Sequence, residues 1–394
     1  MLRHLSKLMW NKKKQHLLLV IEIFFSFLVI FAIATMIVFF YRNYRKPIGL
    51  EDKDVWTVHF DNADTPGSAD SLAAFYDMVH EAVISLPKVR EASYTSFNTP
   101  FGDAMNITAF NTGNKQVGNV YSYHTDDHYA DALGMKLVEG RWFDKTDDAA
   151  RYQPIIINQS LEQAAFGGEA AVGKVIGTDQ DAHKRRIVGV VGDAKVNGDY
   201  RQPNSSIWER IDTNFRRDVT TMLVKVTPDA DATFEGQLFQ LLSNRIKHAD
   251  IGISHLSDSR SNINGQAIIP LIIFGIIAGF LVLNVAFGLF GVLWYNINRR
   301  RGEIGLRRAV GATGGSVATQ LWTETLILAT FALVLGTFFA VQFPLLHVFD
   351  LPTGVYILAL IFAILFIYAL VTICSLYPGR QAAGIYPAVA LHED

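Results

Sequence analysis

This sequence has very little cysteine and very little net charge, and both shortages exclude classes of protein. Its one cysteine, Cys374, lies in an apolar run, so the chain can form neither an intrachain disulfide nor a cysteine-cluster metal site. Only 18% of the 394 residues are charged, and the formal net charge is −2, so no overall basic field is present to attract nucleic acid. The sequence also lacks a nucleophile–base pair, paired carboxylates and a cofactor fingerprint. We therefore expect no catalytic residue and no cofactor bound by this chain.

What the chain has instead is apolar residues, which make up 50% of it and give a mean hydropathy of +0.21. This is high for a soluble protein and low for one that lies wholly in a membrane, which indicates a mixture of the two. Four apolar runs are long enough to cross about 30 Å of hydrocarbon as helices. They are 17–41, 268–295, 321–343 and 354–377. The first is an anchor rather than a signal peptide, because it ends in Phe39-Phe40-Tyr41-Arg42 without a small-residue cleavage site.

The basic residues predict which ends of these helices face the cytoplasm. The loop 296–318 has an excess of arginine over a single acid, and short loops of this kind stay in the cytoplasm. The loop 344–353 has no Lys or Arg, as an external connection should. Residues 1–16, which read as an amphipathic helix on the inner membrane surface, and the tail 378–394 are then cytoplasmic. The segment 47–266 lies on the outer side.

The external segment alternates between strand and helix patterns. Strands are predicted at 55–60, 117–124, 154–157, 186–191 and 220–226, and helices at 71–85, 126–133, 159–166 and 232–248. The polar, irregular stretch 198–218 is predicted to be a long loop. Because the elements do not follow strict strand–helix–strand spacing, an α+β domain is the expected class.

The cytoplasmic loop carries the pattern of a short helix with two different sides. The 100° step between helical residues places Leu306, Ala309 and Val310 on one side. The other side holds the arginines at 300, 301, 307 and 308 around Ile304. Anionic lipid would explain the arginines alone. An exposed Glu303 and Ile304 within the basic side favour docking of a protein partner.

The loop and the helix after it also resemble a known family. The run RRRGEIGLRRAVGAT, followed by QLWTETLIL, is similar to the FtsX-type permease signature of MacB-like ABC transporters. Three further runs are similar to the periplasmic domain of that family. They are LVEGRWF at 137–143, IIINQSLEQAAFGGEAAVGKVIG at 155–177 and RRIVGVVGDAKV at 185–196.

This resemblance implies partners and a site. It implies that the loop is a coupling helix seated on a separate cytoplasmic ABC ATPase, which would bind the ATP and Mg. It assigns the coupling contact to Arg301, Glu303, Ile304, Leu306, Arg307 and Arg308. It also implies a bacterial inner-membrane protein that works as a homodimer or with a paralogous permease. Gly275, Gly279 and Asn284 in the second span are candidate packing residues, because small residues let membrane helices approach closely.

The expected protein is thus an α+β integral membrane protein with four transmembrane helices and a large mixed α/β domain between the first and second. We expect a permease subunit that transmits conformational change from a partner ATPase to the periplasmic domain during export, with no ATPase domain of its own. A periplasmic adaptor and an outer-membrane channel are further partners that the resemblance allows. Two alternatives stay open: an FtsX-like regulator of cell-wall hydrolases and a lipoprotein-release permease. The sequence does not identify the cargo.

Other patterns are interpreted as structural. The segment 168–175 nearly matches a phosphate-binding loop, but Val175 replaces the hydroxyl residue that would hold Mg, so a turn is expected. His124 and His128 have helical spacing, with Asp127 and Asp131 beside them, yet no remote third ligand is evident. No metal site is therefore predicted.

Two acids lie within the apolar runs. Glu22 in the first span is interpreted as lying near the cytoplasmic headgroups, paired with a basic neighbour such as Lys14. Glu324 in the third span is expected to form a hydrogen bond between helices. Whether Glu22 has a functional role stays open.

Overall fold

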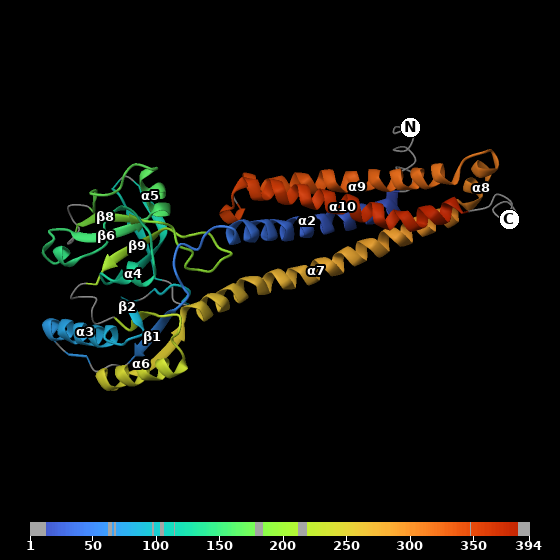
Figure 1. Ribbon diagram of the computed structural model, residues 1–394. Helices are drawn as coiled ribbons and strands as arrows, with labels where there is room; N and C mark the ends of the chain where they lie inside the picture. Colours follow the sequence, from blue (N-terminus) through green and yellow to red (C-terminus); the bar gives the residue numbers. More distant parts are fainter. Residues whose placement is uncertain are drawn as a thin grey trace. The chain divides into compact units, whose positions relative to one another are not determined.

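The chain divides into two compact units. The computed structural model describes residues 13–61, 65–66, 68–96, 98–102, 106–113, 115–177, 184–211, 219–346 and 348–384. Clustering of contacts gives a helical unit, formed by 1–42 and 268–394, and a sheet-containing unit formed by 43–267 (Figure 1). Most of the predicted N-terminal amphipathic helix and the last part of the predicted tail lie outside the described residues.

The helical unit contains the helices that are long and apolar enough to cross a membrane. Among the described residues these are α2 (Lys13–Tyr44), α7 (Leu256–Arg299), α9 (Gly314–Leu345) and α10 (Thr353–Ala383). A short helix, α8 (Arg301–Ala309), connects α7 to α9, and the turn η3 (Val348–Asp350) precedes α10. Each span is apolar around most of its circumference, as expected for a helix whose surroundings are hydrocarbon rather than water.

Close packing of small and large residues holds these helices together. Phe27 of α2 is fully buried, and a Cβ atom added at Gly336 of α9 would lie 2.3 Å from its ring. Ala359, Ala363 and Ile367 of α10 are buried in the same cluster. The glycine at 336 therefore lets the Phe27 ring approach the α9 backbone. Small residues allow such close packing between membrane helices, where the hydrophobic effect does not drive association.

The sheet-containing unit is built on one 11-stranded mixed sheet, as far as the described residues show. Its order is β11 (Asp250–His255), β1 (Val55–Asp61), β10 (Thr221–Val226), β2 (Val89–Ser96), β4 (Gln116–Thr125), β9 (Ser206–Arg210), β6 (Gln153–Asn158), β8 (Arg185–Val191) and β5 (Leu137–Gly140). Strand β3 (Ile107–Asn111) pairs with β4, and β7 (Val175–Ile176) pairs with β8. The pairs β4–β9 and β6–β8 are parallel, whereas the other pairs are antiparallel.

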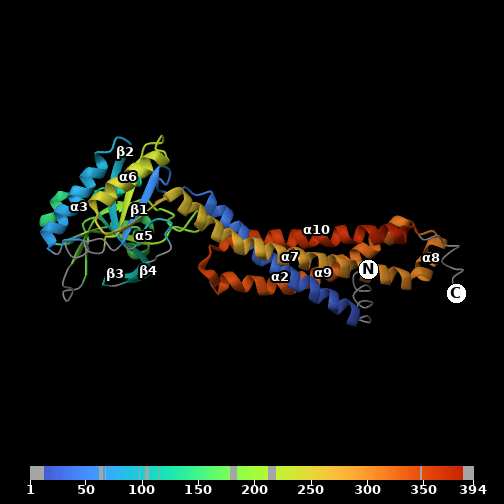
Figure 2. The same ribbon diagram turned by 90° about the horizontal axis from the view of Figure 1, so that it is seen from below.

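The sheet has two halves, each covered by its own helices. Helices α3 (Ala69–Ile84) and α6 (Ala232–Arg245) pack beside β1 and β2, as Figure 2 shows. Helix α5 (Gln159–Phe166) packs on β6 and β8. The two halves meet where β2 pairs with β4 over only two residue pairs, Thr95 with Thr125 and Ser96 with His124. This short ladder, which we call the β2–β4 seam, is the only strand pairing along the main path of the sheet, among the described residues, with just two residue pairs.

The predicted fold class is confirmed, since a mixed α/β sheet unit lies between the first helix and three apolar C-terminal helices. One element was predicted wrongly. The stretch 198–218 is not a single loop, because Ser206–Arg210 forms β9 in the middle of the sheet. Its buried Ile207 and Trp208 pair with β4 and β6, and because these two apolar residues are adjacent the segment shows no alternating pattern.

Two helices begin at residues that the sequence pattern did not mark. Helix α4 (Tyr129–Ala132) has His128 at its N-cap, because Asp126 is drawn away by hydrogen bonds from Ser93 and the Tyr94 backbone. Helix α7 begins at Leu256, well before the apolar run 268–295, so Pro270 lies inside the helix. The polar residues that open α7 gave no apolar signal of a helix.

Candidate functional site

The first candidate site is α8, the short helix between α7 and α9. Helix α7 ends at Arg299, and Arg300 caps α8. The chain then turns at Gly311, whose φ of +106° is a conformation that favours glycine. Thr313 starts α9 by accepting a hydrogen bond from the Ser316 backbone N–H. These two ends fix α8 as a separate element between the spans.

One side of α8 is buried within the helical unit. Ile304 is 6% exposed and packs with Ile297 of α7, Val317 and Leu321 of α9 and Ala382 of α10. The prediction that Ile304 is exposed within a basic side is therefore wrong. The physical reason is that α8 folds back onto the ends of three spans, which take up its one strongly apolar inward residue.

The opposite side of α8 is exposed and apolar. Leu306 is 56% exposed and Val310 is 83% exposed. Both line a groove of about 760 Å³ between α8 and the first turns of α9. The groove is lined by Leu306, Arg307, Val310, Ala312, Ser316, Val317, Thr319, Gln320 and Thr323. An exposed apolar groove with a polar rim is typical of a surface that binds another protein.

The charged residues of α8 are held by partners in the same chain. Arg307 donates to Glu303 Oε1 at 2.5 Å and to Gln320 Oε1 at 2.8 Å. Arg308 donates to the carbonyl oxygen of Ala383. Glu303 is thus not an isolated acid among arginines: it orients Arg307 at the rim of the groove.

Glu324 forms the interhelical bond that the sequence predicted. Arg300 Nη1 lies 3.3 Å from Glu324 Oε2, and Gln320 donates to the same carboxylate at 3.1 Å. Both charged side chains are 21% exposed. This pair ties the α7–α8 turn to α9.

The three residues predicted to pack in the second span make no such contact with the rest of the described chain. Nothing lies within 4 Å of a Cβ atom added at Gly275 or Gly279. Asn284 is exposed and donates to the carbonyl of Phe280 in its own helix. The dimer contact at these residues stays a prediction.

Glu22 packs against α7. A Cβ atom added at Gly288 would lie 2.5 Å from Glu22 Oε2, so the glycine makes room for the carboxylate. The sequence interpretation of Glu22 used only its distance from the start of the span. It did not indicate this contact with α7.

A second polar cluster lies in the sheet-containing unit, and the sequence analysis did not find it. Arg260, near the start of α7, donates to Asp52 at 2.8 Å and to Asp199 at 2.8 Å. Asn264, one turn later, donates to Asp199 Oδ2 and accepts from the Asp199 backbone N–H, both at 2.8 Å. We call Asp52, Asp199, Arg260 and Asn264 the Arg260 cluster. The sequence feature that could have indicated this cluster is an arginine and an asparagine four residues apart, just before an apolar run.

A buried lysine, Lys195, binds the end of α2 and the residues just after it to the loop that holds Asp199. Lys195 is 2% exposed and donates to the carbonyls of Asn43, Lys46 and Asp199 at 2.9, 2.7 and 3.2 Å. Burial lowers the pKa of Lys195, and nearby Asp199 opposes that effect. Charge-assisted bonds to three backbone carbonyls stabilise the loop that holds Asp199.

The near-match to a phosphate loop is a turn, as predicted. Lys174 is engaged by Glu169, 3.1 Å away, and by the ring of Phe166, 4.3 Å from its ammonium group. Gly173 has a φ of +88°, which a turn requires. The ammonium group of Lys174 therefore interacts with Glu169 and Phe166 within the turn.

Comparison with known proteins now gives the family. The MacB-like periplasmic core domain matches residues 17–238, which is more than half of the chain, and the FtsX-like permease C-terminal domain matches residues 275–387. The chain belongs to the MacB/FtsX family of ABC transporter permeases. The predicted resemblance is confirmed, and the chain is a membrane permease with a MacB-like periplasmic domain.

Individual relatives of this MacB/FtsX permease are distant. It is 24% identical to the macrolide export ATP-binding/permease protein MacB of Aggregatibacter actinomycetemcomitans, over 62% of this chain and 38% of the relative. It is 27% identical to the MacB protein of Rhodopseudomonas palustris, over 75% of this chain and 47% of the relative. The uncharacterized ABC transporter permease YvrN of Bacillus subtilis is 24% identical, over 69% of this chain and 70% of the relative. The chain thus spans less than half the length of these two MacB relatives.

Among solved structures, the periplasmic region of MacB from Actinobacillus actinomycetemcomitans is similar. The match has 18% sequence identity and a TM-score of 0.38, and it covers 56% of this chain and 97% of that one.

Proposed function

We propose that this permease couples ATP hydrolysis on a partner ATPase to movement of its periplasmic domain, and that the α8 groove is where the ATPase docks. The observation that carries the proposal is the exposure of Leu306 and Val310 beside the Arg307–Glu303 pair. An apolar groove whose rim carries an oriented charge pair suits a complementary protein surface. ATP and Mg would be bound by the partner, and this chain would supply no catalytic group.

Helix α7 is the element proposed to carry the movement. It runs without interruption from Leu256 to Arg299, so one rod holds Arg260 near its start and leads directly into α8. The spans are strongly apolar, which supports mechanical transmission over passage of a polar substrate between the helices. Movement of α8 would then be transmitted through α7 to the Arg260 cluster.

The proposed assembly is a dimer in the bacterial inner membrane, with both termini and α8 in the cytoplasm. Gly275, Gly279 and Asn284 face outward from the single chain, which leaves that side of α7 available to a second copy or a paralogue. Export is the favoured process because the MacB relatives are named macrolide export proteins. A periplasmic adaptor and an outer-membrane channel would complete such a pathway.

The docking proposal can be tested with two substitutions on the same helix. Val310→Glu places a charge in the groove, whereas Ala309→Glu places the same charge on an exposed residue that does not line it. We expect full-length Val310→Glu, purified from native membranes, to lose at least about 90% of the co-purifying ATPase activity, because a desolvated, unpaired charge costs several kcal/mol.

Ala309→Glu should retain wild-type ATPase activity in the same preparation. Equal ATPase recovery with both variants, at equal membrane yield, would overturn the assignment of the groove.

A further inference from the structure

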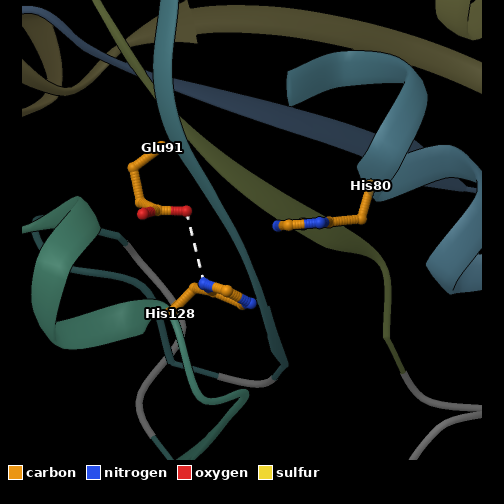
Figure 3. Close-up of side chains that lie close together, drawn as sticks. All are labelled: His80, Glu91 and His128. Atoms are coloured by element: carbon orange, nitrogen blue, oxygen red, sulfur yellow. Dashed lines mark ion pairs between the residues drawn. The ribbon is translucent and has the colours of Figure 1, made fainter. Parts of the chain in front are cut away.

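Two histidines and one glutamate from three separate elements meet in the periplasmic domain. His80 lies on α3, Glu91 on β2, and His128 at the N-cap of α4. Figure 3 shows the His80 and His128 rings facing each other, with the Glu91 carboxylate beside them. Residues so far apart in sequence give no spacing motif, and the sequence analysis considered only His128 among them.

The distances match those that a metal ion requires. One ligand atom from each residue lies within 4.8 Å of the other two. A tetrahedral zinc ion with ligands at about 2.0–2.1 Å separates its ligand atoms by about 3.3 Å. Glu91 Oε1 and His128 Nδ1 are already 3.3 Å apart. The remaining gap to His80 closes with a side-chain shift of about 1 Å or slightly more and a rotation of one ring out of the stack, because imidazole binds a metal in the plane of its ring.

The surrounding structure fixes two of the three residues in place. His80 Nε2 lies 2.9 Å from the carbonyl of Ala92, which orients the ring. The backbone N–H of His128 donates to Asp126 Oδ1 at 3.0 Å, and Asp126 in turn accepts from Ser93 Oγ at 2.6 Å. The contact of the His80 ring with a carbonyl is of the kind that orients histidines in metal sites, whereas the Asp126 contact fixes the backbone of His128.

An ion pair alone does not explain this arrangement. The two imidazole rings stack with centroids 4.7 Å apart, and Glu91 forms its ion pair with His128, which leaves the second ring unexplained by that pair. The domain contains an ordinary pair for comparison, His255 with Glu235 at 3.2 Å. There the ring stacks on Trp56 rather than on a second histidine. A second imidazole at the Glu91 site is what a metal ion would use.

A cavity adjoins the two histidines and would give the ion an open position. His80 and His128 both line a cavity of about 230 Å³, whose wall also carries Asp77, Asp127 and Asp148. Three protein ligands and one open position is the arrangement that leaves room for water or another ligand on zinc. Entry is not blocked, since the His128 side chain is 47% exposed.

We propose that His80, Glu91 and His128 bind a divalent transition-metal ion that prefers imidazole, such as Zn²⁺, with a fourth position open to the cavity. Two imidazoles and one carboxylate select such an ion over Mg²⁺, which prefers an all-oxygen octahedron. The ion joins α3 and β2 to the segment after β4. It therefore bridges the two halves of the sheet near the β2–β4 seam. This site is independent of the α8 groove and of the proposed docking of an ATPase.

The test is zinc binding by the full-length chain in detergent, with any affinity tag removed and metal first stripped by a chelator. Calorimetric titration of wild-type protein should show one zinc ion per chain, unaffected by millimolar Mg²⁺. His80→Gln, Glu91→Gln and His128→Gln should each weaken binding at least about 10-fold, because loss of a ligand costs no less than loss of its supporting contact. His255→Gln should bind as the wild type does. X-ray absorption of the zinc-loaded protein should show two imidazole ligands.

The absorption spectrum keeps the test decisive if a variant folds poorly. The proposal fails if the wild type binds no zinc at micromolar concentrations. It also fails if His80→Gln and His128→Gln retain wild-type affinity, or if the spectrum shows fewer than two imidazoles.

Discussion

The polar groups at the start of α7 and those just past its end are used in opposite ways. In the Arg260 cluster, Asp52 and Asp199 are each 8% exposed, and their carboxylates bond to Arg260 and Asn264 of the same chain. On α8, Glu303 and Arg307 are about half exposed and lie at the rim of an open apolar groove. The polar groups of the Arg260 cluster bond to one another, whereas the charged groups of α8 are exposed at the surface.

This difference indicates that the Arg260 cluster stabilises the fold and that the charged pair on α8 is available for binding a partner. Buried charges that are fully paired cost several kcal/mol to separate, so the Arg260 cluster holds the start of α7 firmly within the sheet-containing unit. An exposed pair is worth little to stability, so Glu303 and Arg307 are free to serve a partner surface. Substitutions in the two regions should therefore have opposite effects on stability and on partner binding.

The largest effect on stability is expected from Arg260→Leu. It removes the guanidinium between two buried carboxylates, which leaves Asp52 without its ion pair and Asp199 with the hydrogen bond from Asn264, and this should lower the free energy of unfolding by about 3 kcal/mol. Denaturant unfolding of the full-length protein in detergent measures this loss. The control is Lys174→Met, which breaks the exposed Lys174–Glu169 pair and should cost less than about 1 kcal/mol. Equal losses in the two variants would contradict the fastening role.

A smaller loss is expected from Gly198→Ala. Gly198 has a φ of +93°, and an added Cβ atom would lie 2.7 Å from Asn264 Oδ1 and 2.8 Å from Ile263 Cγ2 of α7. Backbone strain and this contact should together cost about 1–3 kcal/mol. Gly113→Ala is the matched control, because Gly113 has a φ of +87° but nothing within 4 Å. The difference between the two unfolding free energies isolates the contact with α7, and a difference of zero would refute its importance.

The smallest stability effect, with a large effect on binding, is expected from Glu303→Lys. Loss of the exposed pair with Arg307 should change the free energy of unfolding by less than about 0.5 kcal/mol. The reversed charge should nonetheless prevent ATPase recruitment, because it repels Arg307 and alters the rim of the groove. Co-purification of the ATPase at wild-type yield would show that the rim charges are not part of the docking surface.

The sequence correctly predicted those helices and strands whose formation depends on the pattern of neighbouring residues. The apolar runs identified four spans, and alternation identified strands such as Val55–Asp61, because these signals depend on neighbouring residues alone. The sequence pattern also marked α8 as a helix with two different sides. It did not show which side faces the protein, since Ile304 is buried only because α7, α9 and α10 end beside it.

The features that the sequence did not predict depend on contacts between distant segments. Strand β9 was missed because its place in the sheet is set by β4 and β6 rather than by its own five residues. The Arg260 cluster brings Asp52 and Asp199 to a helix that follows them by a long stretch of chain. Equally, no spacing rule links His80 and Glu91 to His128. Such clusters need a three-dimensional structure.

The most direct test of the account is whether α7 carries movement from α8 to the periplasmic domain. Ile276 of α7 is 69% exposed, so Ile276→Pro adds a second proline to the helix, after the native Pro270, without removing a buried side chain. A proline inside a helix removes a hydrogen bond and costs about 3 kcal/mol. The control is Ile276→Ala, which shortens the same side chain and leaves the helix intact.

The measurement is amide hydrogen exchange in residues 43–267 of the reconstituted permease–ATPase complex, with and without ATP. The wild type and Ile276→Ala should show an ATP-dependent change in exchange. Ile276→Pro should retain ATPase binding and hydrolysis but lose that change. A full ATP-dependent change in Ile276→Pro would contradict transmission through α7.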